Sequence, residues 1–488
     1  MRTCRSCPVR MSSIIVNRWL YRVVVQAIRF HKRGVQQMTS RLLTTLAVFV
    51  LLAVAVDGAG SQPRTDSSTE SPPSLPGIDA PELAGPGHYA VGVRKLTLVD
   101  PNAVDVFAYD PTKGSPPRHD RTLVVDLWYP ALAVRGARPE IYRGALAGEN
   151  GKPVAFSIPG IAVRGARHAP GRHPLVVLSH GYGNATVAMS WLTENLASKG
   201  YVVAAIRHQD SYGNPAGFPE VLLRRPLDIA FVTRSLQGML ASEGLVDPAR
   251  TALVGYSMGG YGVLTAAGAE LDPNGRACAM VPGESLTPYA AHGGREAELR
   301  VANLKAVVAI SPFGGSLGAW GATGMQGIHT ALLLIAGDHD TTAEYASGAR
   351  AFYDGAINAR RYLLTFRGAG HALGLGPAPP QMKHDLWDLD WFEDAVWRKD
   401  RIVAINLHMI TAFLDRNLKG DESRAAYLDQ LVPDSSSGQW TTPPGTPENA
   451  FSPGTGGITV WKGFQRKHAE GLELLHAEPT GNPPGPDR

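Results

Sequence analysis

Residues 251–260 read TALVGYSMGG, and this stretch decides how the 488-residue chain is interpreted. A β-branched apolar run leads into Gly-Tyr-Ser-Met-Gly, and a helix is predicted to follow. A serine at so sharp a turn has a strained backbone, and its neighbours two positions away must be small for strand and helix to approach. The helix N-terminus then directs backbone N–H groups toward the site where negative charge develops. The stretch predicts Ser257 as a nucleophile on a strand–turn–helix.

A serine hydroxyl is a weak nucleophile at neutral pH and needs a base. Residues 361–374, RYLLTFRGAGHALG, read as a strand, a glycine-rich turn and then His371. When the nucleophile precedes its partners in the chain, the expected order is Ser, acid, His. His371 satisfies this order and is the predicted base. His384 is the nearest rival, but its polar, helix-like surroundings indicate a surface residue.

The acid is expected at the end of the strand between these two residues. Residues 331–345, ALLLIAGDHDTTAEY, place Asp338 and Asp340 just past a strand. The acid must reach the far imidazole nitrogen, where it holds the tautomer and stabilises the imidazolium. Asp340 lies two residues deeper in the loop and is chosen, whereas Asp338 is interpreted as a turn residue. Three adjacent residues rarely converge on one ion, so the Asp-His-Asp run predicts no metal, and no cofactor is expected.

Two backbone N–H groups are needed to stabilise the oxyanion of a tetrahedral intermediate. One is expected from Met258, which follows the nucleophile. The other is expected from Tyr182, in the loop His180-Gly181-Tyr182-Gly183 after the strand PLVVLSH. His180 itself is interpreted as a structural histidine that hydrogen-bonds the loop backbone.

From residue 174 onward the chain alternates between apolar strands and helical stretches, which favours a mostly parallel sheet covered by helices on both faces. The α/β domain is predicted over 88–470. Two long connections, 271–300 and 312–327, are expected to form pocket walls or a lid. The predicted strands are 91–99, 122–128, 174–180, 201–207, 251–256, 304–310, 331–336 and 361–366, and the predicted helices are 186–199, 220–243, one starting at 257, and 398–417.

The N-terminal part has a different composition. Residues 1–56 carry nine Lys or Arg and no acidic residue, which leaves 38 basic against 43 acidic side chains in the rest of a chain with net charge +4. The body is therefore mildly acidic, and a nucleic-acid partner is not expected. The apolar run 42–56 is too short for a comfortable membrane span and predicts a signal peptide over 38–59.

These features suggest a secreted or periplasmic protein without a stable membrane span once the signal is removed. The segment 1–37 is interpreted as an upstream start or leader, with an organelle-targeting segment as the alternative. Residues 60–87 are predicted to be a disordered linker, and 471–488 a tail. Past the leader only Cys278 remains, so the mature chain has no internal disulfide.

Several blocks together resemble the α/β-hydrolase superfamily, specifically the predicted dienelactone-hydrolase group related to platelet-activating-factor acetylhydrolases. They are VGVRKLTLVD, PLVVLSHGYG, YVVAAIRHQDS, RRPLDIAFV, VGYSMGG, AGDHD, GAGH and VWKGF. The resemblance implies Ser257, Asp340 and His371 as the catalytic triad, with Tyr182 and Met258 as oxyanion donors. Dienelactone hydrolases use a cysteine nucleophile, however, and the acetylhydrolases usually have His and Phe on either side of the serine. The Tyr-Ser-Met-Gly-Gly pattern is also similar to bacterial cutinase-like polyester hydrolases.

The predicted function is therefore hydrolysis of a carboxylic ester through an acyl-enzyme. The substrate is expected to be a lipid acetyl or short-acyl ester, or a polyester. An acyltransferase with the same triad is the alternative enzyme class, because only the acceptor differs. A non-catalytic surface-binding protein is a further alternative, which the ordered Ser, Asp and His disfavour. A peptidase is disfavoured because the sequence shows no second, propeller-like domain.

Overall fold

The computed structural model describes residues 71–149, 151–210, 217–430, 432–441, 445 and 457–480. The predicted leader and signal peptide, 1–59, lie outside this part of the chain. None of the helices in the described part combines the length and the hydropathy that a membrane crossing requires.

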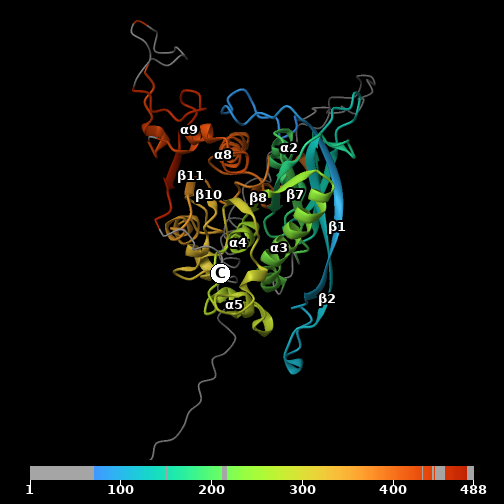
Figure 1. Cartoon of the computed structure of the whole chain (residues 1–488). Coiled ribbons are helices and arrows are strands. Elements are labelled where there is room, and N and C mark those ends of the chain that lie inside the picture. Colours follow the sequence, from blue (N-terminus) through green and yellow to red (C-terminus); the bar gives the residue numbers. More distant parts are fainter. Residues whose placement is uncertain are drawn as a thin grey trace, which may run out of the picture. The chain divides into compact units, whose positions relative to one another are not determined.

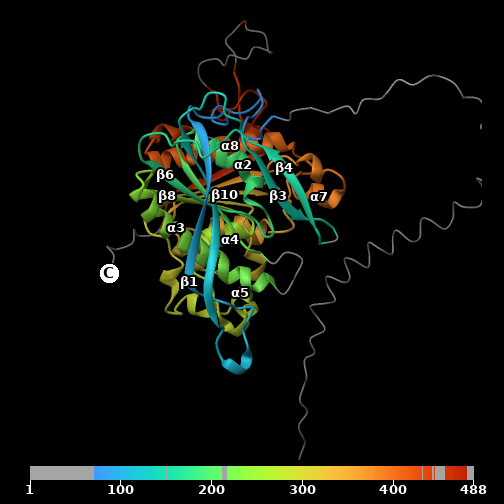
Figure 2. The same ribbon diagram turned by 90° about the vertical axis from the view of Figure 1, so that its right-hand side faces the viewer.

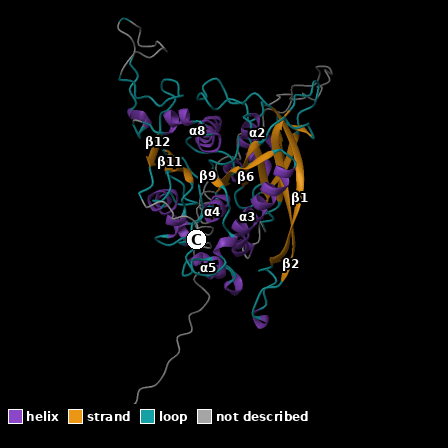
Figure 3. Cartoon of the chain, viewed as in Figure 1, coloured by secondary structure: helices purple, strands orange, loops and turns teal. Residues whose placement is uncertain are grey.

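A ten-stranded sheet forms the centre of the domain (Figures 1 and 3). Strands β7, β6, β8, β9, β10 and β11 are neighbours in that order and run parallel. Strand β2 is antiparallel to both β7 and β1, and β12 is antiparallel to β11. The bounds in spatial order are β12 (Leu472–Ala477), β11 (Arg361–Phe366), β10 (Ala331–Gly337), β9 (Leu304–Ile310), β8 (Val246–Tyr256), β6 (His173–Ser179), β7 (Val202–Arg207), β2 (Arg118–Ala131), β1 (Ala90–Val104) and β5 (Val163–Arg164).

The strand order reverses at β6. The chain goes from β6 outward to β7, then returns to place β8 on the other side of β6. Loops leaving the two sides of such a reversal diverge, which leaves a crevice at the carboxyl ends of the strands. Ser179 at the end of β6 is paired with Gly255 near the end of β8. The loop after β6 and the turn after β8 therefore start side by side, at the place where a parallel sheet binds its ligands.

Helices cover both faces of the sheet (Figures 1 and 2). Successive residues of a strand point to opposite faces, so an apolar run such as that of β6 contributes to two cores. Val176 and Leu178 pack with α2 (Ser190–Ser198) and α8 (Lys399–Lys419). Leu175 and Val177 pack with α3 (Phe218–Ser242) and α4 (Met258–Ala266). The predicted mostly parallel α/β sheet with helices on both faces is confirmed.

Helix α3 contains Pro226, which cannot donate the hydrogen bond to the carbonyl four residues earlier. That carbonyl belongs to Leu222, and the Tyr261 hydroxyl of α4 donates to it at 2.9 Å. Across this contact Gly262 of α4 lies so close to α3 that an added Cβ would be 2.6 Å from Ile229 Cδ1. The two helices are thus held together where one of them has lost a backbone hydrogen bond.

The domain is larger than the sequence predicted, because segments at both ends pack on it. The predicted linker is wrong for residues 71–87, since Ser74 donates to Glu194 at 2.8 Å and Asn195 donates to the Ala84 carbonyl at 2.9 Å. The predicted tail is wrong for Leu472–Ala477, which forms β12 along β11. Both segments bury apolar or polar groups against the domain, a tertiary interaction that composition alone does not reveal.

A hairpin of β3 (Ile141–Ala147) and β4 (Pro153–Pro159) was not predicted, because glycine and prolines interrupt its pattern. Figure 2 shows it beside α7 (Leu386–Asp390). The glycine-rich segment 312–327, expected to form a pocket wall or a lid, is packed closely against the domain. Its Trp320 is buried between Tyr261 and Phe352, and an added Cβ on Gly324 would lie 2.1 Å from the Glu270 carbonyl oxygen. Close packing against backbone carbonyls requires glycine at Gly315, Gly324 and Gly327.

Candidate active site

Ser257 occupies the turn between β8 and α4, as its sequence context predicts. Its backbone has φ 53° and ψ −114°, and its side chain is almost buried, with 9% of the residue exposed. An added Cβ on Gly255 would lie 2.3 Å from the Gly259 carbonyl oxygen, and one on Gly259 would lie 2.0 Å from that of Ser179. Any larger residue at either position would push strand and helix apart. The glycines therefore permit the strained turn that presents the serine.

A continuous hydrogen-bonded relay joins the three predicted residues. His371 Nε2 is 2.9 Å from Ser257 Oγ, and His371 Nδ1 is 2.7 Å from Asp340 Oδ2. The carboxylate requires an N–H on Nδ1, which leaves Nε2 to accept the serine proton. His371 reaches both partners from the loop after β11, and Asp340 from the loop after β10. The structure thus brings together Ser257 and His371, which are 114 positions apart in the sequence.

Asp340 is held ionised by its surroundings. Burial favours the neutral carboxyl, but the hydrogen bond and charge of His371 and two backbone N–H groups outweigh it, so the Asp340 pKa lies below its usual value. Those N–H groups, of Thr342 and Ala343, each donate to Oδ1 at 2.9 Å. Asp338 instead accepts from the Gly368 N–H at 2.6 Å and fixes the turn after β11. The two aspartates thus have different hydrogen-bond partners, and the role of Asp340 as the acid stays a prediction.

The loop that carries His371 is held by side chains that the sequence did not indicate. Four consecutive carbonyls, of residues 371–374, each accept a hydrogen bond from a different side chain, and these come from β8, α8 and α2. The donors are the Tyr256 hydroxyl at 3.3 Å, Lys399 Nζ, Asn406 Nδ2 at 3.0 Å and Trp191 Nε1 at 3.1 Å, respectively. Their sequence separations leave no local signal by which this arrangement could have been found.

The two predicted oxyanion donors lie on adjacent elements. Met258 is the first residue of α4, and Tyr182 is in the loop between β6 and the 3₁₀ helix η2 (Thr186–Met189). His180 Nδ1 is 2.7 Å from the Gly181 carbonyl oxygen. Burial, with the nearby Arg225, lowers the His180 pKa to about 3, so the ring is neutral at pH 7. It hydrogen-bonds the loop backbone, as predicted. His384, the rival base, is exposed.

Three partly exposed aromatic residues form a wall beside the turn at Ser257. The Tyr182 and Phe218 rings are 5.6 Å apart, those of Phe218 and Phe313 are 5.9 Å apart, and both pairs are edge to face. The Phe313 N–H donates to the Ser257 carbonyl at 3.0 Å, which ties this wall to the turn between β8 and α4. Aromatic surface of this kind favours contact with apolar or aromatic groups. No cluster of His, Cys, Asp and Glu within the described ranges is arranged to hold a metal ion.

Two of the three comparisons with known proteins found a similar protein. Residues 163–292 match the family model of PETase, described as PET hydrolase-like, a range that includes the loop at Tyr182 and Ser257. A solved ferulic acid esterase from Streptomyces cinnamoneus is 24% identical, covering 70% of this chain and 94% of its own, with a TM-score of 0.47. No curated protein sequence matches the chain. The narrower resemblance to dienelactone hydrolases stays a prediction. The sheet order, the turn at Ser257 and the family match place the chain in the α/β-hydrolase superfamily.

Proposed function

We propose that the protein hydrolyses a carboxylic ester through an acyl-enzyme on Ser257. The observation that carries this proposal is the relay from Asp340 through His371 to the serine, with distances of 2.7 and 2.9 Å, at a strained turn beneath a helix N-terminus. A purely structural serine would not need a base hydrogen-bonded to it and a carboxylate behind that base.

In the proposed reaction, Ser257 Oγ attacks the ester carbonyl carbon while His371 Nε2 takes its proton. The carbonyl oxygen becomes an oxyanion, which the N–H groups of Met258 and Tyr182 stabilise. The C–O bond to the alcohol then breaks, and the imidazolium returns its proton to the leaving alkoxide. Water repeats the sequence on the acyl-enzyme, so that the carboxylic acid leaves and Ser257 is restored. Asp340 stays ionised throughout and stabilises the imidazolium.

The substrate class that we favour is an ester with an aromatic or apolar group next to the carbonyl, including polyesters. The wall of Tyr182, Phe218 and Phe313 supports this choice, and so does the PET hydrolase-like description of the matching family. A lipid acetyl or short-acyl ester is the competing substrate class, and the same residues would hydrolyse it. A chain-length series of p-nitrophenyl esters, compared with aromatic polyester oligomers, separates these substrates.

Ser257→Ala is expected to abolish ester hydrolysis while the protein stays folded. The matched control is Ser242→Ala on the surface of α3, where the hydroxyl bonds only its own helix and activity should be unchanged. Initial rates with p-nitrophenyl butyrate and covalent labelling by a fluorophosphonate are the measurements. A variant that kept more than about a tenth of the wild-type rate would exclude Ser257 as the nucleophile. Faster product release on adding an alcohol acceptor would instead reveal acyl transfer.

A further inference from the structure

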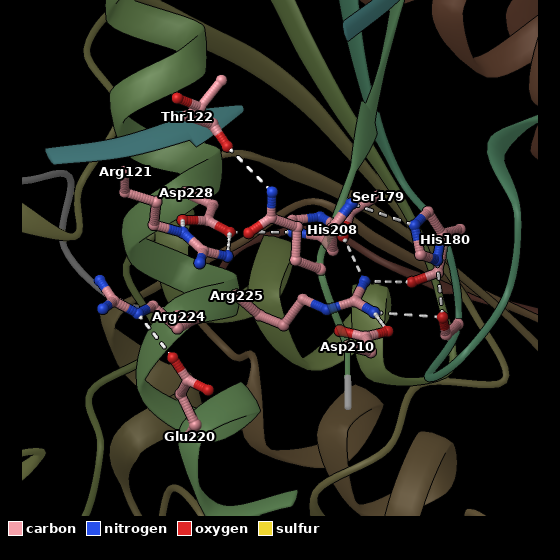
Figure 4. A network of polar contacts seen from close by, with 12 residues as sticks. Arg121, Thr122, Ser179, His180, His208, Asp210, Glu220, Arg224, Arg225 and Asp228 are labelled. Atoms are coloured by element: carbon pink, nitrogen blue, oxygen red, sulfur yellow. Dashed lines mark hydrogen bonds and ion pairs between the residues drawn. The ribbon is translucent and has the colours of Figure 1, made fainter. Parts of the chain in front are cut away.

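The backbone of the loop after β6 is held by one buried arginine (Figure 4). Arg225 of α3 has no exposed surface, and its guanidinium donates to two successive carbonyls of the loop. Nη1 donates to the His180 carbonyl, and Nη2 donates to that of Gly181 at 3.1 Å. Nη2 also pairs with Asp210, whose carboxylate accepts the Gly183 N–H at 2.8 Å. Three backbone groups of the loop are therefore fixed from its buried side.

Of these three backbone groups, the Gly181 carbonyl sets the orientation of the Tyr182 N–H. It belongs to the same peptide unit as the Tyr182 N–H, and in a planar trans peptide these two groups point in opposite directions. A guanidinium that holds the carbonyl on the α3 side therefore turns the Tyr182 N–H away from α3. His180 Nδ1, 2.7 Å from the same oxygen, supports the same orientation. Rotation of this peptide would remove the donor from the oxyanion site.

The held loop lies directly against the nucleophile turn. An added Cβ on Gly259, in the first turn of α4, would be 2.8 Å from the His180 carbonyl oxygen, and one on Gly181 would be 3.1 Å from the Tyr256 ring. Ser179, which precedes the loop, pairs with Gly255, which precedes the turn. The loop that contains the Gly181–Tyr182 peptide is therefore in contact with Tyr256 and Gly259, on either side of Ser257.

The arginine is supported by a chain of polar groups on its other side (Figure 4). Its Nη1 donates to Ser179 Oγ at 3.2 Å, and Ser179 Oγ is 2.9 Å from His208 Nε2. His208 Nδ1 is 3.2 Å from Asp228, which also binds Arg121 through two hydrogen bonds of 2.9 and 3.0 Å. Only an arginine has donors in a planar fork that can reach two carbonyls and a carboxylate together.

We propose that Arg225 is the positioning residue of the oxyanion hole, because it holds the Gly181–Tyr182 peptide with the Tyr182 N–H toward the reacting carbonyl. This inference rests on the proposed ester hydrolysis and extends it to a residue that does not touch the substrate. Asp210 assists by neutralising the arginine and by fixing Gly183.

The test compares Arg225→Met with Arg224→Met. Arg224 is the neighbouring buried arginine of α3, and its ion pair is with Glu220 and not with the loop. We expect Arg225→Met to lower kcat by about 10²- to 10³-fold with little change in KM, which is the effect of losing one oxyanion donor. The affinity for phenylboronic acid, which forms a tetrahedral adduct on the serine, should fall in parallel. Arg225→Lys, which can reach one carbonyl, should recover part of the loss. Arg224→Met should leave kcat and boronate affinity near their wild-type values.

Folded fractions measured by circular dichroism normalise every rate. A folded Arg225→Met enzyme with kcat within about 3-fold of wild type would overturn the proposal, as would equal losses in the Arg224 and Arg225 variants. If Arg225→Met does not fold, the same comparison is made between Arg225→Lys and Arg224→Lys. Wild-type protein that neither hydrolyses esters nor reacts with a fluorophosphonate would show that the proposed function itself has failed.

Discussion

At the scale of single residues, the role of each polar side chain in this site depends on which atoms it contacts. Asp338 and Asp340 are two positions apart and chemically identical, yet one binds a turn N–H and the other binds the imidazole. Tyr256 contributes its hydroxyl to the His371 carbonyl, and its ring lies 5.4 Å from the imidazole. Residues of the same type can therefore have different roles, and their contacts in the folded protein decide which role each has.

Asp340→Asn is expected to lower kcat by about 10⁴-fold, because an amide leaves His371 in the wrong tautomer. Asp338→Asn should keep a nearly normal kcat, since within the described part of the chain its carboxylate accepts the Gly368 N–H and contacts neither His371 nor Ser257. The Asp338→Asn substitution should lower the free energy of unfolding by on the order of 1 kcal/mol, which is the usual effect of weakening one hydrogen bond. The kcat values of the two variants are measured at matched folded fractions. A near-inactive Asp338→Asn beside an active Asp340→Asn would reverse the assignment.

At the scale of elements, the close approach of β8, α4 and the loop after β6 sets the geometry of the turn at Ser257. The glycines here are required by contact distances. Gly238 on α3 is different, because an added Cβ there meets nothing within 4 Å. Close packing therefore does not require a glycine at that position.

Gly259→Ala and Gly238→Ala form a matched pair of the same substitution in two helices. The first places a methyl group 2.0 Å from the Ser179 carbonyl oxygen and should destabilise the protein by roughly 3 kcal/mol or more, with loss of activity. The second should stabilise it by about 0.5–1 kcal/mol, through better helix propensity. Urea unfolding and kcat report both effects. Equal stabilities for the two variants would contradict the contact distances at the turn.

At the scale of the whole molecule, the domain buries several histidines that must stay neutral. The His208 pKa is lowered to about 4, mainly by burial and then by Arg225. The His180 and His408 pKa values are lowered to about 3, again mainly by burial. Unfolding returns all three to their usual value of about 6.5. At a pH between the folded pKa values and the unfolded value, the unfolded chain therefore binds more protons than the folded chain does.

The stability of the protein is thus expected to fall as the pH drops below about 6.5, by up to about 1.4 kcal/mol per pH unit for each of these histidines. The carboxylates with lowered pKa, such as Asp228 and Asp340, add to the loss only at more acidic pH, because their stabilising effect is complete above the unfolded value. Urea midpoints at pH 7, 6 and 5 measure the effect. His384→Gln, at an exposed position, should leave the slope unchanged. A constant midpoint over this range would refute the prediction.

The sequence alone determined the alternating strands and helices, the turn at Ser257 and the order of its partners, because apolar periodicity and the glycine spacing are local properties. It predicted β9 (Leu304–Ile310) and β11 (Arg361–Phe366) with the bounds observed. Only the tertiary structure decided which distant side chains hold the loops of the site. Lys399, Asn406 and Arg225 act through backbone carbonyls far away in sequence, and a carbonyl has the same chemistry in every residue. The packing of 71–87 and the pairing of β12 likewise depend on surfaces that exist only after folding.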